Sequence, residues 1–137
     1  MKNAIRAGGV YFAIVFACAF AIGTVRVLLV APRTGATVAV MLEAPLVLAI
    51  SWLAFRWCVR RWATSSRASD RMVMGATGFG LLLAAEAGVG SIIFHRSLHD
   101  QITALGTLPG AIGLAAQIGF ALIPLAGLLV DGARRRP

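Results

Sequence analysis

Charge is scarce in this 137-residue sequence, in which only 13% of the residues are charged and only five are acidic. The hydrophobic share is 59%, well above the roughly 45–50% of soluble domains, and this excludes an ordinary soluble fold. Cysteine is scarce too. Cys18 and Cys58 each lie within an apolar run, and this pattern excludes a disulfide framework and a multi-cysteine metal site.

Catalytic signatures are also absent, since the sequence holds no phosphate-binding P-loop and no G-x-S-x-G, H-E-x-x-H or C-x-x-C motif. The only two histidines, His95 and His99, would share one face if a helix ran through both, which is a metal-compatible spacing. Asp100 would not share that face, so a third ligand is missing. The sequence therefore predicts no metal, no cofactor and no catalytic residue, and it argues against an enzyme without excluding one.

Four apolar runs dominate the sequence, each close to the roughly 20 residues that a membrane-spanning helix needs. They predict an all-α, integral-membrane four-helix bundle formed by residues 1–137 as a single domain, with spans at about 9–29, 38–58, 72–94 and 108–130. The predicted connections are outer loops at 30–37 and 95–107 and a cytoplasmic loop at 59–71. Proline and glycine in Ala31-Pro32-Arg33-Thr34-Gly35 predict a turn in the first outer loop.

The net charge of +8 is concentrated at the two ends of the chain and in one gap between the runs. These basic clusters are Lys2 and Arg6, then Arg56, Arg60, Arg61, Arg67 and Arg71, and finally Arg134, Arg135 and Arg136. The remaining basic residues are Arg26, Arg33 and Arg96. By the positive-inside rule this distribution predicts a bacterial inner-membrane protein with both termini in the cytoplasm, whose charge contacts lipid headgroups rather than nucleic acid.

The first apolar run also resembles a signal peptide, because Lys2 and Arg6 precede it and Ala19-Phe20-Ala21 matches an A-x-A cleavage site. The run continues to Val30, however, and so exceeds the roughly 7–15 residues of a signal-peptide core. We therefore expect the first helix to be retained, with cleavage as the alternative.

Three charged residues fall inside the apolar runs, where a charge costs about 2.5–3.5 kcal/mol and usually faces protein or water. Arg26, Glu43 and Glu86 all fall in the outer third of the predicted membrane, and Gln117 adds a polar group near its middle. A pair of Arg26 with either glutamate would leave the other glutamate available for a proton. The alternative is that these residues only fix helix packing, or that Arg26 extends to the lipid headgroups.

Two prolines fall inside predicted helices. Pro45 cannot donate a backbone hydrogen bond, which leaves the Met41 carbonyl without its usual partner and predicts a kink beside Glu43. Pro124 predicts a similar kink in the last helix. Irregular backbone beside a buried carboxylate is typical of binding sites in membrane proteins, whereas a proline tolerated in an ordinary helix is the alternative.

One set of short motifs runs through the first half of the chain: Tyr11-Phe12, Arg26-Val27, Ala31-Pro32-Arg33, Gly35 and Leu42-Glu43-Ala44-Pro45-Leu46. This pattern resembles a group of short, uncharacterised four-span inner-membrane proteins of bacteria. The resemblance implies a four-span membrane fold and brings no known activity with it.

The sequence supports three functional hypotheses and favours the first, a packing or assembly partner in the membrane. Glycines such as Gly106 and Gly110 allow close helix contacts, whether within the fold itself, within a homodimer or with another membrane protein. The alternative is a proton-coupled small transporter or channel that uses Glu43, Glu86 and Arg26. The third hypothesis is a membrane-embedded enzyme or cofactor binder.

Overall fold

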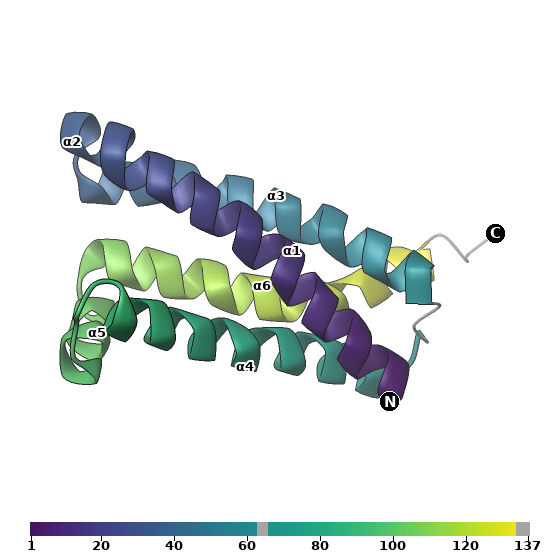
Figure 1. Ribbon diagram of the computed structural model, residues 1–137. Helices are drawn as coiled ribbons and strands as arrows, with labels where there is room; N and C mark the ends of the chain where they lie inside the picture. The colour runs from purple at the N-terminus through teal and green to yellow at the C-terminus, as the bar shows by residue number, and fades with distance from the viewer. Residues whose placement is uncertain (63–65, 134–137) are drawn as a thin grey trace.

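The computed structural model describes residues 1–62 and 66–133, and all regular structure within them is helical (Figure 1). Four helices are long and apolar enough to cross a membrane, and they cover Lys2–Thr34, Ala36–Trp62, Ala68–Ile92 and Leu108–Gly132. The predicted all-α class is confirmed for the described residues, and the four long helices form a bundle. The basic cluster at 134–136 lies outside the described residues.

The first long helix consists of three consecutive segments, which are α1 (Lys2–Val25), the π-helical η1 (Arg26–Val30) and α2 (Ala31–Thr34). Pro32 has no N–H, and just before it the Ala31 N–H donates to the Arg26 carbonyl five residues earlier, which widens the turn. Gly35 then reverses the chain with a φ of 84°, which glycine adopts without strain. The predicted loop at 30–37 is wrong, because Pro32 is tolerated in the first turn of α2 and only Gly35 is non-helical.

The chain then returns in α3 (Ala36–Trp62), and a second helical hairpin follows with α4 (Ala68–Ile92), α5 (Leu98–Leu105) and α6 (Leu108–Ala133). Both α3 and α4 extend into the predicted cytoplasmic loop at 59–71, of which residues 63–65 lie outside the described residues. The outer loop predicted at 95–107 contains α5.

A capping box explains why α5 forms in this polar segment. The Ser97 hydroxyl accepts a hydrogen bond from the Asp100 N–H at 3.1 Å, and the Asp100 carboxylate accepts one from the Ser97 N–H at 3.2 Å. These two bonds satisfy backbone donors at the start of the helix that have no partner within it. The prediction of a loop at 95–107 did not take this capping box into account.

The helices are arranged as a square in which α1 packs against α3 and α4, and α6 packs against the same two helices (Figure 1). At one end, which we call the terminal end, the Met1 amino group lies 3.3 Å from Asp70 and the Arg71 guanidinium 3.5 Å from Asp131. Gly35 and α5 lie at the other end, the hairpin end. There the α1–α3 pair splays away from the α4–α6 pair.

Aromatic and backbone contacts across the bundle close its terminal half. Tyr11 of α1 is fully buried and its ring stacks on Phe120 of α6, with the centroids 4.4 Å apart. The Tyr11 hydroxyl donates to the Phe120 carbonyl at 2.8 Å. This carbonyl lacks its usual helical donor because Pro124, four residues later, has no N–H. The proline thus creates the acceptor that joins α1 to α6.

Two glycines of this half allow close approach of helix backbones. A Cβ at Gly8 would lie 2.6 Å from the Met74 carbonyl oxygen of α4, and one at Gly75 would meet the Ala121 carbonyl of α6. A larger residue at either position would push α4 away from a neighbouring helix. A Cβ at Gly80 would meet nothing within 4 Å, so the small residues of α4 differ sharply in what they contact.

Candidate functional site

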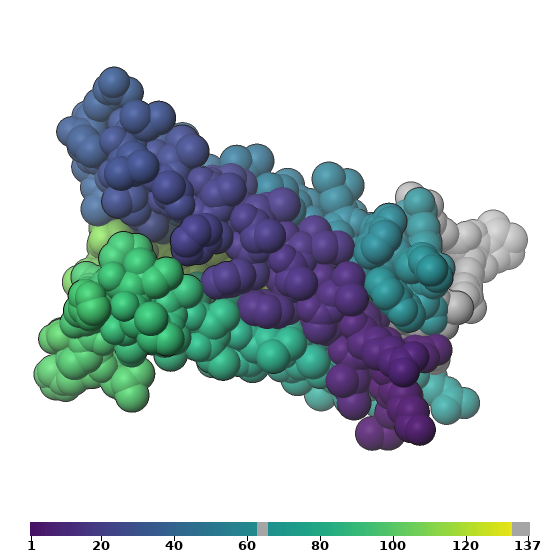
Figure 2. Space-filling view, viewed as in Figure 1, coloured from purple at the N-terminus to yellow at the C-terminus, as the bar shows by residue number. Residues whose placement is uncertain are grey.

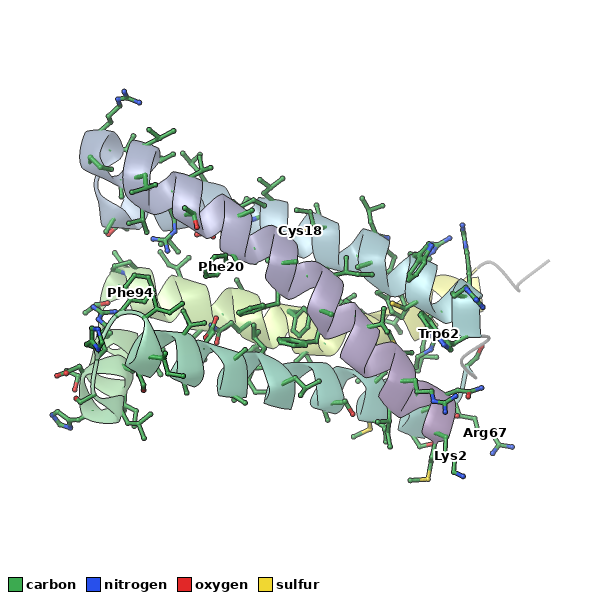
Figure 3. All side chains as sticks on the ribbon, viewed as in Figure 1. Lys2, Cys18, Phe20, Trp62, Arg67 and Phe94 are labelled. Atoms are coloured by element: carbon green, nitrogen blue, oxygen red, sulfur yellow. The ribbon has the colours of Figure 1, made fainter. Side chains whose placement is uncertain are left out.

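A cavity of about 670 Å³ occupies the splayed half of the bundle, bounded by residues of α1, α4 and their neighbours. Figure 2 shows the surface hollowed between these two helices toward the hairpin end. Most of the lining side chains are apolar and include Phe20 and Phe94, which Figure 3 labels in this half of the molecule. The four polar residues singled out in the sequence, Arg26, Glu43, Glu86 and Gln117, all line this one cavity.

Arg26 and Glu43 form an ion pair on the wall made by the first hairpin. The Arg26 Nε lies 2.5 Å from the Glu43 Oε2, and the two side chains are 27% and 16% exposed. Gly23, one helical turn before Arg26, leaves room for this carboxylate, because a Cβ there would lie 3.3 Å from the Glu43 Oε1. The pair joins η1 to α3 and carries no net charge.

Glu86 of α4 faces Gln117 of α6 on the opposite wall. The Gln117 Nε2 lies 2.8 Å and 2.7 Å from the two carboxylate oxygens of Glu86, so the amide donates to the carboxylate. The Glu86 side chain is accessible from the cavity. Within residues 1–62 and 66–133, no cationic side chain forms an ion pair with it. The structure therefore pairs Arg26 with Glu43 and leaves Glu86 with a neutral partner.

Helix α5 covers the hairpin end of the cavity. Leu98 and Ile102 line the cavity from α5, and Gln101 fastens this helix to the end of α4. The Gln101 Nε2 lies 3.3 Å from the Ser91 hydroxyl and 3.3 Å from the Arg96 carbonyl. Its side chain rests on Gly90, where a Cβ would lie 2.5 Å from the Gln101 Oε1. Because Leu98 and Ile102 line the cavity, the face of α5 toward the cavity is apolar.

The two prolines differ in their surroundings. Pro45 lies in α3 two residues after Glu43, and α3 continues through it, as α6 continues through Pro124. Neither proline ends a helix. A continuous helix can still bend, so the kinks predicted at the two prolines stay predictions. Pro124 is fully buried against α4. Pro45 lies beside the Arg26–Glu43 pair, and its missing backbone N–H makes the hydrogen bonding of α3 irregular there.

The two histidines do not share a helix face. Helix α4 ends at Ile92, His95 has a φ of 50°, and α5 begins only at Leu98. The condition for a common face, one helix running through both His95 and His99, is therefore not met, because the capping box starts a new helix between them. In the part of the chain that the structure describes, no group of three histidine, cysteine or acidic residues could hold a metal ion.

Arg71 is a buried charge that the sequence pattern did not reveal. Its side chain is 1% exposed, its guanidinium carbon lies 5.1 Å from the centre of the Phe55 ring, and its Nη2 lies 3.5 Å from the Asp131 Oδ2. Its Nε and Nη1 have no hydrogen-bond partner among the described residues. A basic residue beside a polar segment predicts a solvated charge. Arg71 is instead buried at the terminal end, because it contacts Phe55 of α3 and Asp131 of α6.

None of the comparisons with known proteins found a match, whether to a protein family, a curated protein or a solved structure. The site must therefore be understood from its own chemistry. An apolar cavity of this volume lies within the roughly 300–1,000 Å³ of small-molecule sites, and its few polar groups are arranged on two facing walls. Such a site can hold a molecule that is largely apolar and carries one polar or charged group.

Proposed function

We propose that the chain is an integral membrane protein of the bacterial inner membrane with four spans and both termini in the cytoplasm. Its four long apolar helices support this proposal. Large apolar side chains also cover the outside of the bundle, among them Leu53 at 68% and Leu129 at 77% exposed. Exposing so much apolar surface to water along the whole length of a monomer would be unfavourable, whereas lipid chains would cover it.

The basic residues support the orientation. Lys2, Arg6, Arg56, Arg60 and Arg61 lie toward the ends of α1 and α3 that meet at the terminal end. Of the three basic residues toward the hairpin end, Arg26 is neutralised by Glu43. The positive-inside rule therefore assigns the terminal end to the cytoplasm and the cavity to the outer half of the membrane.

We propose further that the cavity binds an amphipathic small molecule and that the protein is a small carrier. The observation that supports this most directly is the cavity itself, a space of about 670 Å³ with apolar walls and with Arg26, Glu43, Glu86 and Gln117 facing into it. A bundle that is open in one half and closed in the other has the form of one state of an alternating-access carrier. The proposal combines this form with the carboxylates that the transporter hypothesis invokes.

The test is to fill the cavity without disturbing the rest of α1. Ala19 lines the cavity, whereas Ala17, two residues earlier on the same helix, is exposed and does not line it. We expect Ala19→Trp to weaken the binding of a neutral fluorescent apolar probe to the purified protein in nanodiscs by about tenfold or more, because the indole occupies the site. The measurement is a fluorescence titration of the wild type and of both variants.

Ala17→Trp is the matched control and should bind the probe as the wild type does. Equal weakening by both substitutions would mean that the probe binds to the lipid-facing surface, and equal affinity in all three proteins would place the probe elsewhere. Either result would contradict the proposed cavity site. Flux of a bound compound across proteoliposomes, abolished by Ala19→Trp, would then separate a carrier from a binding protein.

The hypothesis of a packing or assembly partner stays a prediction. The outward glycines of α4, such as Gly80 and Gly88, leave open space at their surface but do not indicate what covers it. Stoichiometric co-purification of one membrane protein after gentle solubilisation would support that hypothesis. The homodimer and the cofactor binder likewise stay predictions.

A further inference from the structure

Four charged side chains line the cavity, which are Arg26, Glu43, Glu86 and Arg96. Arg26 and Glu43 neutralise each other through their ion pair. Arg96 lies at the hairpin end beside Asp100 of α5, whose pKa is lowered by the hydrogen bonds from Ser97 and, to a lesser extent, by this arginine. Glu86 alone has no charge of opposite sign beside it among the described residues.

The amide of Gln117 orients Glu86 but does not neutralise it. Because one nitrogen lies 2.8 Å and 2.7 Å from the two carboxylate oxygens, one N–H directed between them donates to both. This three-centre hydrogen bond holds the carboxylate in place with further lone pairs available to the cavity. A carboxylate inside a membrane requires a neutralising partner, and a proton or a bound cation are the two that can reach it through the cavity.

The walls around Glu86 favour a large apolar cation over a small hydrated one. Phe16, Phe20 and Phe94 line the same cavity together with leucine and isoleucine side chains. Aromatic faces attract cations, and apolar walls gain free energy by covering an apolar group. A metal ion would find only the carboxylate and one amide oxygen near this position, too few ligands for a hard cation.

We infer that Glu86 is the counter-ion for an amphipathic organic cation, and that one proton leaves the cavity for each cation that binds. This inference rests on the proposed function, since it names the class of molecule that the cavity would carry. When the site is empty the carboxyl group holds its proton. When the cation enters, the O–H bond breaks, the proton passes to water at the open side of the cavity, and the carboxylate neutralises the cation. The net charge of the site is the same before and after.

The experiment compares two probes of similar shape, the tetraphenylphosphonium cation and neutral triphenylphosphine oxide. In nanodiscs at neutral pH, we expect Glu86→Gln to weaken binding of the cation by about tenfold or more, because a charge pair at close range is lost. Binding of the neutral probe should change little, which also shows that the variant is folded. A glutamine at position 86 can still form amide hydrogen bonds with Gln117.

Proton release gives the second measurement. In weakly buffered solution the wild type should release about one proton per bound cation, as the balanced exchange requires, and Glu86→Gln should release none. The affinity for the cation should rise with pH in the wild type and be flat in the variant. Arg26, Glu43 and Arg96 face the same cavity, so an unchanged pH dependence in Glu86→Gln would assign the proton to one of them and overturn the inference.

The outcomes separate this inference from the proposed function. If both probes bind the wild type and Glu86→Gln equally well, the cavity binds apolar molecules and Glu86 is not a counter-ion. If the cation binds more weakly to the variant but no proton is released from the wild type, the exchange is wrong. If neither probe binds the wild type at all, the proposed cavity site fails, and the inference fails with it.

Discussion

The same four helices build a closed terminal half and an open hairpin half. In the terminal half, Tyr11 and Phe120 stack across the bundle, and Gly8 lets α1 lie against the backbone of α4. In the hairpin half, the facing groups are long and charged, and each ion pair or hydrogen bond stays on its own wall. Small residues and backbone acceptors thus join the two hairpins in the terminal half, whereas the polar pairs of the hairpin half join helices within each hairpin.

The comparison also separates two kinds of buried charge. Arg71 at the terminal end pairs with Asp131 within the second hairpin, from α4 to α6, but its guanidinium also contacts the Phe55 ring of α3 in the first hairpin. Arg26 reaches only from η1 to α3, within one hairpin. A charge that connects different hairpins fixes their separation, whereas one that stays within a hairpin leaves the two hairpins free to part. If the protein is a carrier, Arg71 belongs to the contact that must open at the terminal end.

The largest expected effect on stability concerns the close helix contact at Gly75. Gly75→Ala should lower the free energy of unfolding by about 1–3 kcal/mol, because the added methyl group meets the Ala121 carbonyl and forces α4 from α6. Gly80→Ala, on the same helix with open space around it, should instead raise it by up to about 1 kcal/mol through helix propensity. Denaturant unfolding of both variants in detergent measures this difference.

Opposite signs at these two positions would confirm that close backbone contact joins α4 to α6 in the terminal half. A stabilising or neutral Gly75→Ala would contradict the closed packing of α4 on α6. A destabilising Gly80→Ala would instead mean that a partner covers the outward face of α4, which would favour the packing-partner hypothesis.

A second prediction concerns the charge contact at the terminal end. Breaking a buried ion pair costs about 3–5 kcal/mol, and we expect Asp131→Asn to cost about 2 kcal/mol because Asp131 is 38% exposed. Without its partner, Arg71 should leave the Phe55 ring of α3 for water, so the buried Cys58 thiol, also on α3, should react faster with maleimide in a Cys18→Ser background. The double variant Arg71→Met and Asp131→Asn should recover much of the stability, since no uncompensated buried charge is left.

Stability and thiol reactivity together decide this prediction. If Asp131→Asn is destabilised but Cys58 stays as protected as in the parent, the ion pair has a local role only and does not close the terminal end. If the double variant is no more stable than Asp131→Asn, the loss comes from Asp131 itself rather than from an unpaired Arg71.

The difference between the two halves also explains how much could be predicted from the sequence. The number of long helices follows from hydrophobic run length, and the polar residues of the cavity stand out because charges are rare inside apolar runs. The sequence could not predict whether Arg26 pairs with Glu43 or with Glu86. The pairing with Glu43 depends on Gly23, which leaves room for the Glu43 carboxylate against the first helix. That contact joins residues of two helices and has no signature in either alone.

The terminal half was less accessible to prediction. Arg71 belongs to a run of basic residues that sequence reasoning assigns to a solvated loop, and its burial arises only when Phe55 and Asp131 meet it. At the hairpin end, the turn predicted at 30–37 is wrong for a different reason, since a proline in the first turn of a helix costs no helical hydrogen bond and leaves the chain helical. Both errors concern residue types whose meaning depends on their place in the fold.

The smallest expected effect concerns α5 at the hairpin end, where local hydrogen bonds replace packing. The Ser97 hydroxyl donates to the Asp100 carboxylate at 2.7 Å, and this bond holds the pKa of Asp100 below its ordinary value of 3.8. Because the folded-state pKa is the lower one, the stabilisation of α5 is fully present above the unfolded value. It is lost as the pH falls through the folded value, so α5 should be unaffected at neutral pH and fray only in acid.

An NMR titration of the Asp100 carboxyl carbon measures this pKa directly. We expect Ser97→Ala to raise it toward 3.8, because the variant removes the hydroxyl donor while the backbone N–H stays in place. The amides of Gly75 and Tyr11, at the closed half, should show no shift over the same acid range. An unchanged Asp100 pKa in Ser97→Ala, or simultaneous loss of both halves in acid, would mean that α5 is held by packing and that the two halves unfold as one unit.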